Sequence, residues 1–175
     1  MAKRQLDSID YRILEQLQKD ARTPLEKIAK LAGVPKSTIH YRVRKLEKNG
    51  FIQGYYAKVD PSLCGRDFAA VSLIRGKYGP RYHERLGKKL AKIPGVWFVH
   101  FVFGDWDFIV LSRSSSREAL TKVIEAIINM EEVERGTTLI TSKIFKEEDR
   151  IEFDQHGPLH VETVSAPNST HKTRA

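Results

Sequence analysis

The chain has 175 residues, of which 41% are hydrophobic and 30% charged, and its formal net charge is +8. This length suits one ordinary domain or two small ones, and the positive charge favours an anionic partner such as nucleic acid. A single cysteine, Cys64, excludes an intrachain disulfide, and no apolar run approaches the ~18 residues of a membrane-spanning helix. The first residues do not have the pattern of a signal peptide, so we expect a cytoplasmic protein with no membrane contact.

Two short helices are predicted within residues 8–31. Asp7 can cap the first, which runs to about Asp20 and carries apolar residues at helical spacing. Residues 23–26 match a capping box that starts the second helix, and Gly33 allows a tight turn after it. The two helices should therefore pack together through their apolar faces.

A third helix is predicted from near Pro35 to Lys48. Ile39, Val43 and Leu46 share one face and should pack on the first two helices. The other faces carry cations and hydrogen-bonding side chains at a spacing that follows the major groove of DNA. The candidates for DNA contact are Ser37, Thr38, His40, Tyr41 and Arg44 toward the bases, with His40 equally able to meet a phosphate, and Lys36, Arg42, Lys45 and Lys48 toward phosphates.

The positive charge is concentrated in this part of the chain. Residues 1–60 hold 13 Lys and Arg against 7 Asp and Glu, whereas residues 61–150 hold 15 against 12. A solvated basic helix would explain the charge alone, but not its coincidence with the tight turn and the apolar stripe. Residues 1–53 are therefore predicted to be a helix-turn-helix domain that binds double-stranded DNA.

The rest of the chain alternates between strand-like and helical periods. Residues 54–66 are predicted to be a strand linker, and residues 151–175 a polar C-terminal tail. Between them, residues 67–150 follow the order β-α-β-β-α-β, which is typical of a ferredoxin-like domain with four antiparallel strands and both helices on one face. The expected strands are 68–75, 96–103, 107–113 and 133–146, and the expected helices are 80–92 and about 115–130.

The strand expected at 96–103 is apolar on both faces, with Trp97, Val99, Phe101 and Phe103 on one and Val96, Phe98, His100 and Val102 on the other. A half-solvated antiparallel strand would be polar on one face. A second sheet should therefore cover it, which predicts a homodimer. His100 is expected to be buried or in that interface, and no Cys or His spacing suggests a metal site.

The sequence resembles the Lrp/AsnC, or feast/famine, family of transcriptional regulators. The matching residues are 6–22 (LDSIDYRILEQLQKDAR), 42–56 (RVRKLEKNGFIQGYY), 93–96 (IPGV) and 102–110 (VFGDWDFIV), and residues 77–97 are similar to archaeal members in particular. The resemblance implies an α+β protein, with a winged-type helix-turn-helix joined to a ligand-sensing ferredoxin-like domain. It also implies homodimers that often assemble into larger homo-oligomers.

The resemblance further implies an amino-acid effector, bound near the turn formed by Gly104, Asp105, Trp106 and Asp107. A free amino acid needs acceptors for its ammonium group and donors for its carboxylate. The two aspartates supply acceptors, and hydroxyls come from Thr137, Thr138 and Thr141. Asp107 could instead orient the turn, and the residues do not fix which side chain is recognised.

The favoured interpretation is a sequence-specific DNA-binding regulator whose DNA binding or assembly responds to a small molecule such as an amino acid. An architectural DNA-binding protein without an effector is the alternative. An enzyme is less favoured: haem-precursor decarboxylases share this two-domain plan but need a histidine-lined pocket, and His40, His83 and His100 form no such group. No cofactor is expected.

Overall fold

The computed structural model describes residues 6–153, and the chain divides into two compact units. Within the described residues, 6–56 and 148–153 form one, called here the helical unit, and 57–147 form the sheet unit. The linker expected at 54–66 contains no strand, because its backbone does not pair with another strand. Most of the predicted tail lies outside the described residues. No helix within residues 6–153 is long and apolar enough to cross a membrane.

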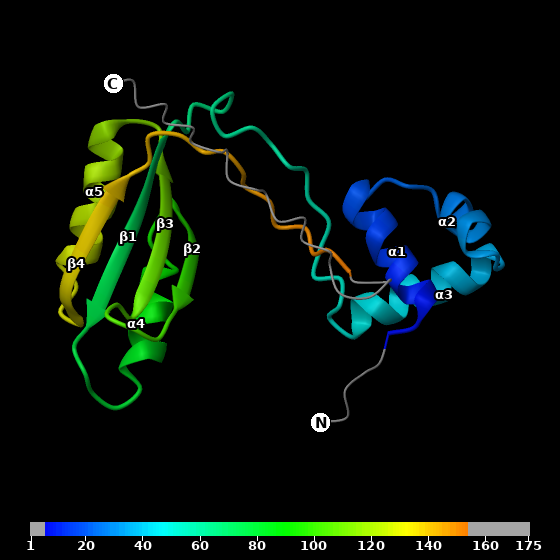
Figure 1. The fold of residues 1–175 in the computed structure, drawn as a ribbon, viewed down its shortest axis with the longest axis horizontal. Coiled ribbons are helices and arrows are strands. Elements are labelled where there is room, and N and C mark those ends of the chain that lie inside the picture. Colours follow the sequence, from blue (N-terminus) through cyan, green and yellow to red (C-terminus); the bar gives the residue numbers. More distant parts are fainter. Residues whose placement is uncertain (1–5, 154–175) are drawn as a thin grey trace, which may run out of the picture. The chain divides into compact units, whose positions relative to one another are not determined.

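The helical unit contains the three predicted helices. They are α1 (Ser8–Lys19), α2 (Leu25–Ala32) and α3 (Lys36–Lys48), as Figure 1 shows. Their shared core consists of Ile13, Leu14, Ile28, Ala29, Ile39, Val43 and Leu46. The apolar stripe predicted for the third helix is therefore confirmed. Residues 6–56 contain no strand, so the wing implied by the resemblance is not seen there.

The ends of these helices differ in how they are capped. Asp7 accepts hydrogen bonds from the amides of Ile9 and Asp10, at 2.9 and 3.0 Å, and Asp10 completes a capping box. The capping box predicted at 23–26 is wrong, because Pro24 holds the N-cap position and no side chain caps α2. The tight turn is confirmed, with Gly33 at a φ of 66° that its missing Cβ permits.

Residues 148–153 belong to the helical unit, although the sequence suggested only the start of a tail. The side-chain amide of Gln18 donates to the Ile151 carbonyl at 3.0 Å and accepts from the Ile151 N–H at 2.7 Å. The Phe153 ring packs on the helical core, edge to face with Tyr11 at 5.3 Å between centroids. This return segment, residues 148–153, therefore forms a fourth packed element of the unit.

Replacing Phe153 with alanine should lower the free energy of unfolding of the helical unit by about 1–3 kcal/mol, because a half-buried ring is lost. Gln18→Ala should act in the same direction. Ile151→Ala is the matched control, because that side chain is 67% exposed and only its backbone makes the hydrogen bonds. Denaturant unfolding of the full chain, followed by circular dichroism, measures the three variants. An equal loss in Ile151→Ala would contradict the assignment.

The sheet unit has the predicted β-α-β-β-α-β order. Its elements are β1 (Phe68–Gly76), α4 (Tyr82–Leu90), β2 (Val96–Phe101), β3 (Phe108–Ser114), α5 (Arg117–Ile128) and β4 (Val133–Ile140). The strands lie in the order β2-β3-β1-β4, and every neighbouring pair is antiparallel. The ferredoxin-like fold class is thus confirmed, and β1 and β3 occupy the centre of the sheet (Figure 1).

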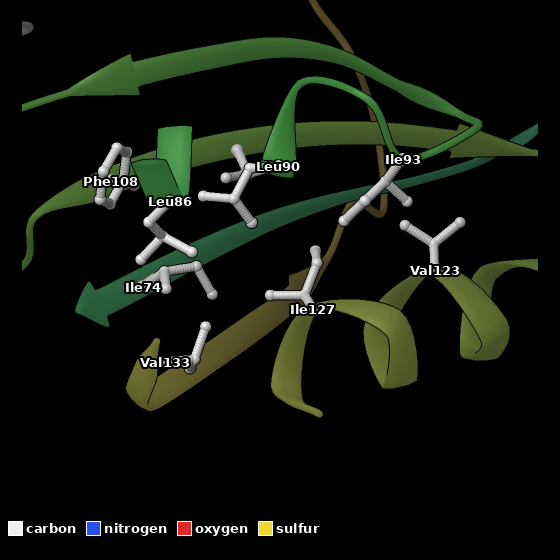
Figure 2. Close-up of a cluster of buried hydrophobic side chains, with 9 residues drawn as sticks. Ile74, Leu86, Leu90, Ile93, Phe108, Val123, Ile127 and Val133 are labelled. Carbon is white, nitrogen blue, oxygen red and sulfur yellow. The ribbon is translucent and has the colours of Figure 1, made fainter. Parts of the chain in front are cut away.

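Both helices pack on the same face of this sheet. Figure 2 shows side chains of α4 and α5 meeting those of the strands in one core, made of Ile74, Leu86, Leu90, Ile93, Phe108, Val110, Val123, Ile127 and Val133. Every second residue of β1 points away from this core. The strand register places these residues beside residues of the neighbouring strands that also point away from it. We call this side the open sheet face; its apolar residues are Val71, Leu73, Phe98, Ile109, Leu111 and Leu139.

The alternation expected for residues 96–103 is interrupted. The pairing of β2 with β3 shifts between Val96 and Phe98, and the strand ends at Phe101. Because of this shift, Val96 and Val99 both pack against the core, whereas Phe98 pairs with Leu111 on the open sheet face. The strand has apolar residues on both faces, as predicted, but their division is corrected.

Candidate nucleic-acid interface and effector site

The exposed side of α3 is a continuous polar surface. Its buried side anchors the helix, while Ser37, His40, Tyr41, Arg44, Lys45 and Lys48 are exposed and Thr38 is half-buried. Tyr41 is 66% exposed, although it is a large aromatic residue. This 13-residue helix is roughly 20 Å long, and the diameter of an α-helix, about 10–12 Å with side chains, fits a major groove about 12 Å wide.

Two of the predicted phosphate contacts are held by carboxylates. The Arg42 Nη1 atom lies 2.6 Å from an Asp7 oxygen and 2.9 Å from an Asp10 oxygen, with the side chain 24% exposed. Arg42 therefore ties α3 to the N-terminus of α1, which favours a structural role for this side chain over the predicted phosphate contact. Lys36 pairs with Glu26 of α2, but both side chains are exposed, so this pair can open toward a phosphate.

The Asp7 carboxyl makes the stability of the helical unit depend on pH. The backbone N–H of Asp10, followed by Arg42, holds the pKa of Asp7 below its usual range. A carboxyl with a lowered folded pKa stabilises the fold above its unfolded pKa, near ~4, and this contribution is lost as the pH falls through the folded pKa. Asp7→Asn should therefore melt below the wild type at pH 7, and the difference should vanish in acid. A difference that persists once Asp7 is fully protonated in acid would contradict this cause.

A shallow hollow borders α3 and contains residues that the sequence alone did not single out. His40 and Arg44 line it together with Arg22, from the turn between α1 and α2, and Tyr55. The Tyr55 hydroxyl donates to Glu47 at 2.8 Å, and burial together with this carboxylate raises the pKa of Tyr55 to about 12. The phenol thus stays protonated and holds Glu47, which leaves the two arginines as the cations of the hollow.

At the turn expected to bind an effector, the two aspartates have different surroundings. Asp105 is exposed, whereas Asp107 is 6% exposed. The Asp107 carboxylate accepts from the Gly76 N–H at 2.8 Å and from the Tyr82 hydroxyl at 3.2 Å. Burial and this carboxylate raise the pKa of Tyr82, so its hydroxyl remains a donor. The geometry therefore favours Asp107 as a structural part of the turn and leaves Asp105 available to a ligand.

Two arginines that the sequence did not single out flank this turn. Arg75 and Arg135 lie directly opposite each other on β1 and β4. Arg75 donates to the Asp105 carbonyl at 3.1 Å, and the Arg135 guanidinium lies 5.0 Å from the centroid of the half-buried Trp106 ring. Among residues 6–153 neither arginine has a carboxylate within 4.0 Å. Two neighbouring like charges are unfavourable unless an anion joins them.

The three candidate threonines do not form one group. Thr138 lies on the helix side of the sheet and its hydroxyl is 2.9 Å from that of Ser72. Thr137 is exposed and paired with Leu73, on the open sheet face. Thr141 follows β4 and donates its N–H to the Ala69 carbonyl at 2.9 Å. Of the three, Thr137 shares a face with Arg75 and Arg135.

Comparison with known proteins identifies both units. A family model described as the AsnC-type helix-turn-helix domain matches residues 6–47, and the Lrp/AsnC ligand binding domain matches residues 68–151. The HTH-type transcriptional regulators FL11 of Pyrococcus furiosus and Pyrococcus horikoshii are 38% and 37% identical over 142 residues, which is 81% of this chain and 93% of each relative.

Solved structures show the same fold. AsnC of E. coli is 29% identical, with a TM-score of 0.74 over 83% of this chain and 97% of its own. A transcriptional regulator from Neisseria meningitidis, solved as an L-Met complex, is 18% identical, with a TM-score of 0.77 over 86% of this chain and 98% of its own. The second likeness concerns the fold alone.

A helix-turn-helix unit followed by a ligand-binding sheet unit defines a DNA-binding transcriptional regulator. The chain belongs to the Lrp/AsnC family of such regulators, as its resemblance to archaeal members indicated. Its relatives are named as regulators, so it is a regulator and not an enzyme. Within residues 6–153 no three His, Cys, Asp or Glu side chains gather in a group that could hold a metal ion.

Proposed function

We propose that the protein is a sequence-specific regulator that binds double-stranded DNA through α3 as a homodimer and responds to an amino acid at the turn 104–107. The observation that carries the DNA-binding part is the anchoring of α3. Ile39, Val43 and Leu46 hold its buried side, so the polar side chains opposite them are presented on a fixed helix. A rigid helix with exposed donors is what reading of base edges requires.

Arg44 is the proposed base contact, because a guanidinium pairs bidentately with guanine. Arg44→Gln should weaken binding to the operator by about 1–3 kcal/mol and relax specificity at one position. Lys45→Gln, the matched control, should weaken binding to all DNA alike. Binding titrations at several salt concentrations, with DNA from upstream of the gene, test both. Uniform weakening by Arg44→Gln would make it a phosphate contact, and wild-type binding that ignores sequence would favour an architectural role.

The proposed homodimer uses the open sheet face. This face is apolar at the centre of the sheet, on β1 and β3, and no helix of the unit covers it. A twofold dimer would present two copies of α3 to half-sites about 34–36 Å apart.

For the effector, we propose a site that includes two arginines beside the turn 104–107. Asp105 supplies an acceptor for an ammonium group, and Arg75 and Arg135 supply donors for a carboxylate. An amino acid carries both groups, and the Neisseria relative was solved with L-Met. These observations support an amino-acid effector with Arg75 and Arg135 at its carboxylate.

A thermal-shift screen against the twenty amino acids tests the effector. A specific ligand at 100 times its dissociation constant should stabilise the protein by about 2.7 kcal/mol. Arg135→Gln should remove the shift while the free protein stays folded, since Arg135 is exposed. Absence of a shift with every amino acid would count against the effector, and an unchanged shift in Arg135→Gln against this placement.

A further inference from the structure

The positive charge of the sheet unit is concentrated at α4. Residues 77–92 contain six Lys and Arg and one acid, Glu84. The remainder of residues 57–147 contains nine Lys and Arg against ten Asp and Glu, so its net charge is slightly negative. The resulting surface is separate from α3, which belongs to the other unit.

Four of these cations lie on or next to α4. Arg85 and Lys88 are i, i+3 neighbours within the helix, Arg81 holds its N-cap position and Lys92 follows its C-cap. All four are exposed, whereas Leu86 and Leu90 on the opposite side are fully buried in the core. We call Arg81, Arg85, Lys88 and Lys92 the basic stripe.

Within the described residues the charge of the basic stripe is offset only in part. Lys89, beside the stripe, pairs with Glu132, and both Lys89 and Arg85 lower the pKa of this carboxyl. Arg81, Arg85, Lys88 and Lys92 have no ion pair within 4.0 Å in residues 6–153. Four like charges on and beside one short helix repel each other, and a line of anions would remove this repulsion.

We infer that the basic stripe is a second DNA-contacting surface, which holds phosphates of duplex outside the site read by α3. The nine residues of α4 extend over roughly 13 Å. One DNA strand carries a charge about every 3.4 Å of helix axis, so the stripe spans several successive phosphates. The stripe lies on the helix layer, opposite the open sheet face, so the proposed dimer leaves it exposed. This inference rests on DNA being the partner of α3.

The salt dependence of DNA binding tests the stripe without knowledge of the operator. The full-length protein is titrated with a long duplex of arbitrary sequence over a range of salt concentrations. Log K falls as log salt rises, and each lost phosphate contact reduces the steepness of this fall by about 0.9. Lys88→Gln/Lys92→Gln should therefore reduce it by about 1.8 per protomer. The matched control is Arg117→Gln/Lys122→Gln, which removes two exposed cations of α5 and should leave the slope unchanged.

The possible outcomes distinguish a failure of the inference about the stripe from a failure of the proposed DNA binding by α3. An unchanged slope in the stripe variant, or an equal decrease in both variants, would overturn the inference. If the stripe variant kept its DNA binding but no longer bound phosphatidylserine vesicles, the inference would also be overturned, because the stripe would then be a membrane-binding surface. Failure of the wild-type protein to bind any DNA would instead refute the proposed function. Lys45→Gln, on α3, should lower the slope even in the stripe variant, because its phosphate contact is independent.

Discussion

Replacing Asp107 with alanine should destabilise the sheet unit by about 2–3 kcal/mol, because the Gly76 N–H and the Tyr82 hydroxyl would both lose a charged acceptor in a buried place. Asp107→Asn, which keeps the shape and one acceptor oxygen, should cause a smaller loss. Asp105→Ala is the matched control. Its carboxylate is exposed and the hydrogen bond to Arg75 uses only its carbonyl, so stability should not change.

Tryptophan fluorescence measures this effect selectively. The two tryptophans of the chain, Trp97 and Trp106, both lie in the sheet unit, so their emission in denaturant follows that unit alone. In an effector assay the expected order reverses: Asp105→Ala should lose the response while it remains fully folded. If Asp107→Ala were as stable as the wild type but unresponsive to ligand, the carboxylate would be a ligand contact and the structural role would be wrong.

The helices and strands were predictable because their signals are local. In α3, Ile39, Val43 and Leu46 repeat at helical spacing, and that repeat alone determines which side is buried. The β-bulge in β2 was not predictable in the same way. Alternation assumes a regular pleat, whereas the extra residue between Val96 and Phe98 moves Val96 to the face of Val99.

The roles of individual side chains depend on partners far away in the chain. Arg42 has the composition of a DNA contact, but its carboxylate partners come 32 and 35 residues earlier. Phe153 lies in a stretch without periodicity, and its partner Tyr11 is at the other end of the chain. Arg75 and Arg135 are brought together only by the register of β1 and β4. None of these pairs has a local sequence signal.

A charged substitution on the open sheet face is the strongest test of whether DNA binding depends on the dimer. Leu73 lies at its centre, with Ile109 of β3 on one side and Thr137 of β4 on the other. In a single chain a glutamate here would reach solvent and be tolerated. In a face-to-face dimer the same carboxylate would be buried without a partner, which is strongly unfavourable.

Leu73→Glu should therefore convert the dimer to a folded monomer, as seen by analytical ultracentrifugation. Binding to a two-half-site operator should then fall roughly 10²- to 10⁴-fold, because linked binding by two copies of α3 is lost. The matched control is Ala126→Glu, which places the same charge on the exposed side of α5, in the helix layer. Binding to a single half-site should be equal in both variants, since α3 is untouched. A Leu73→Glu protein that stays dimeric would show that the interface lies elsewhere.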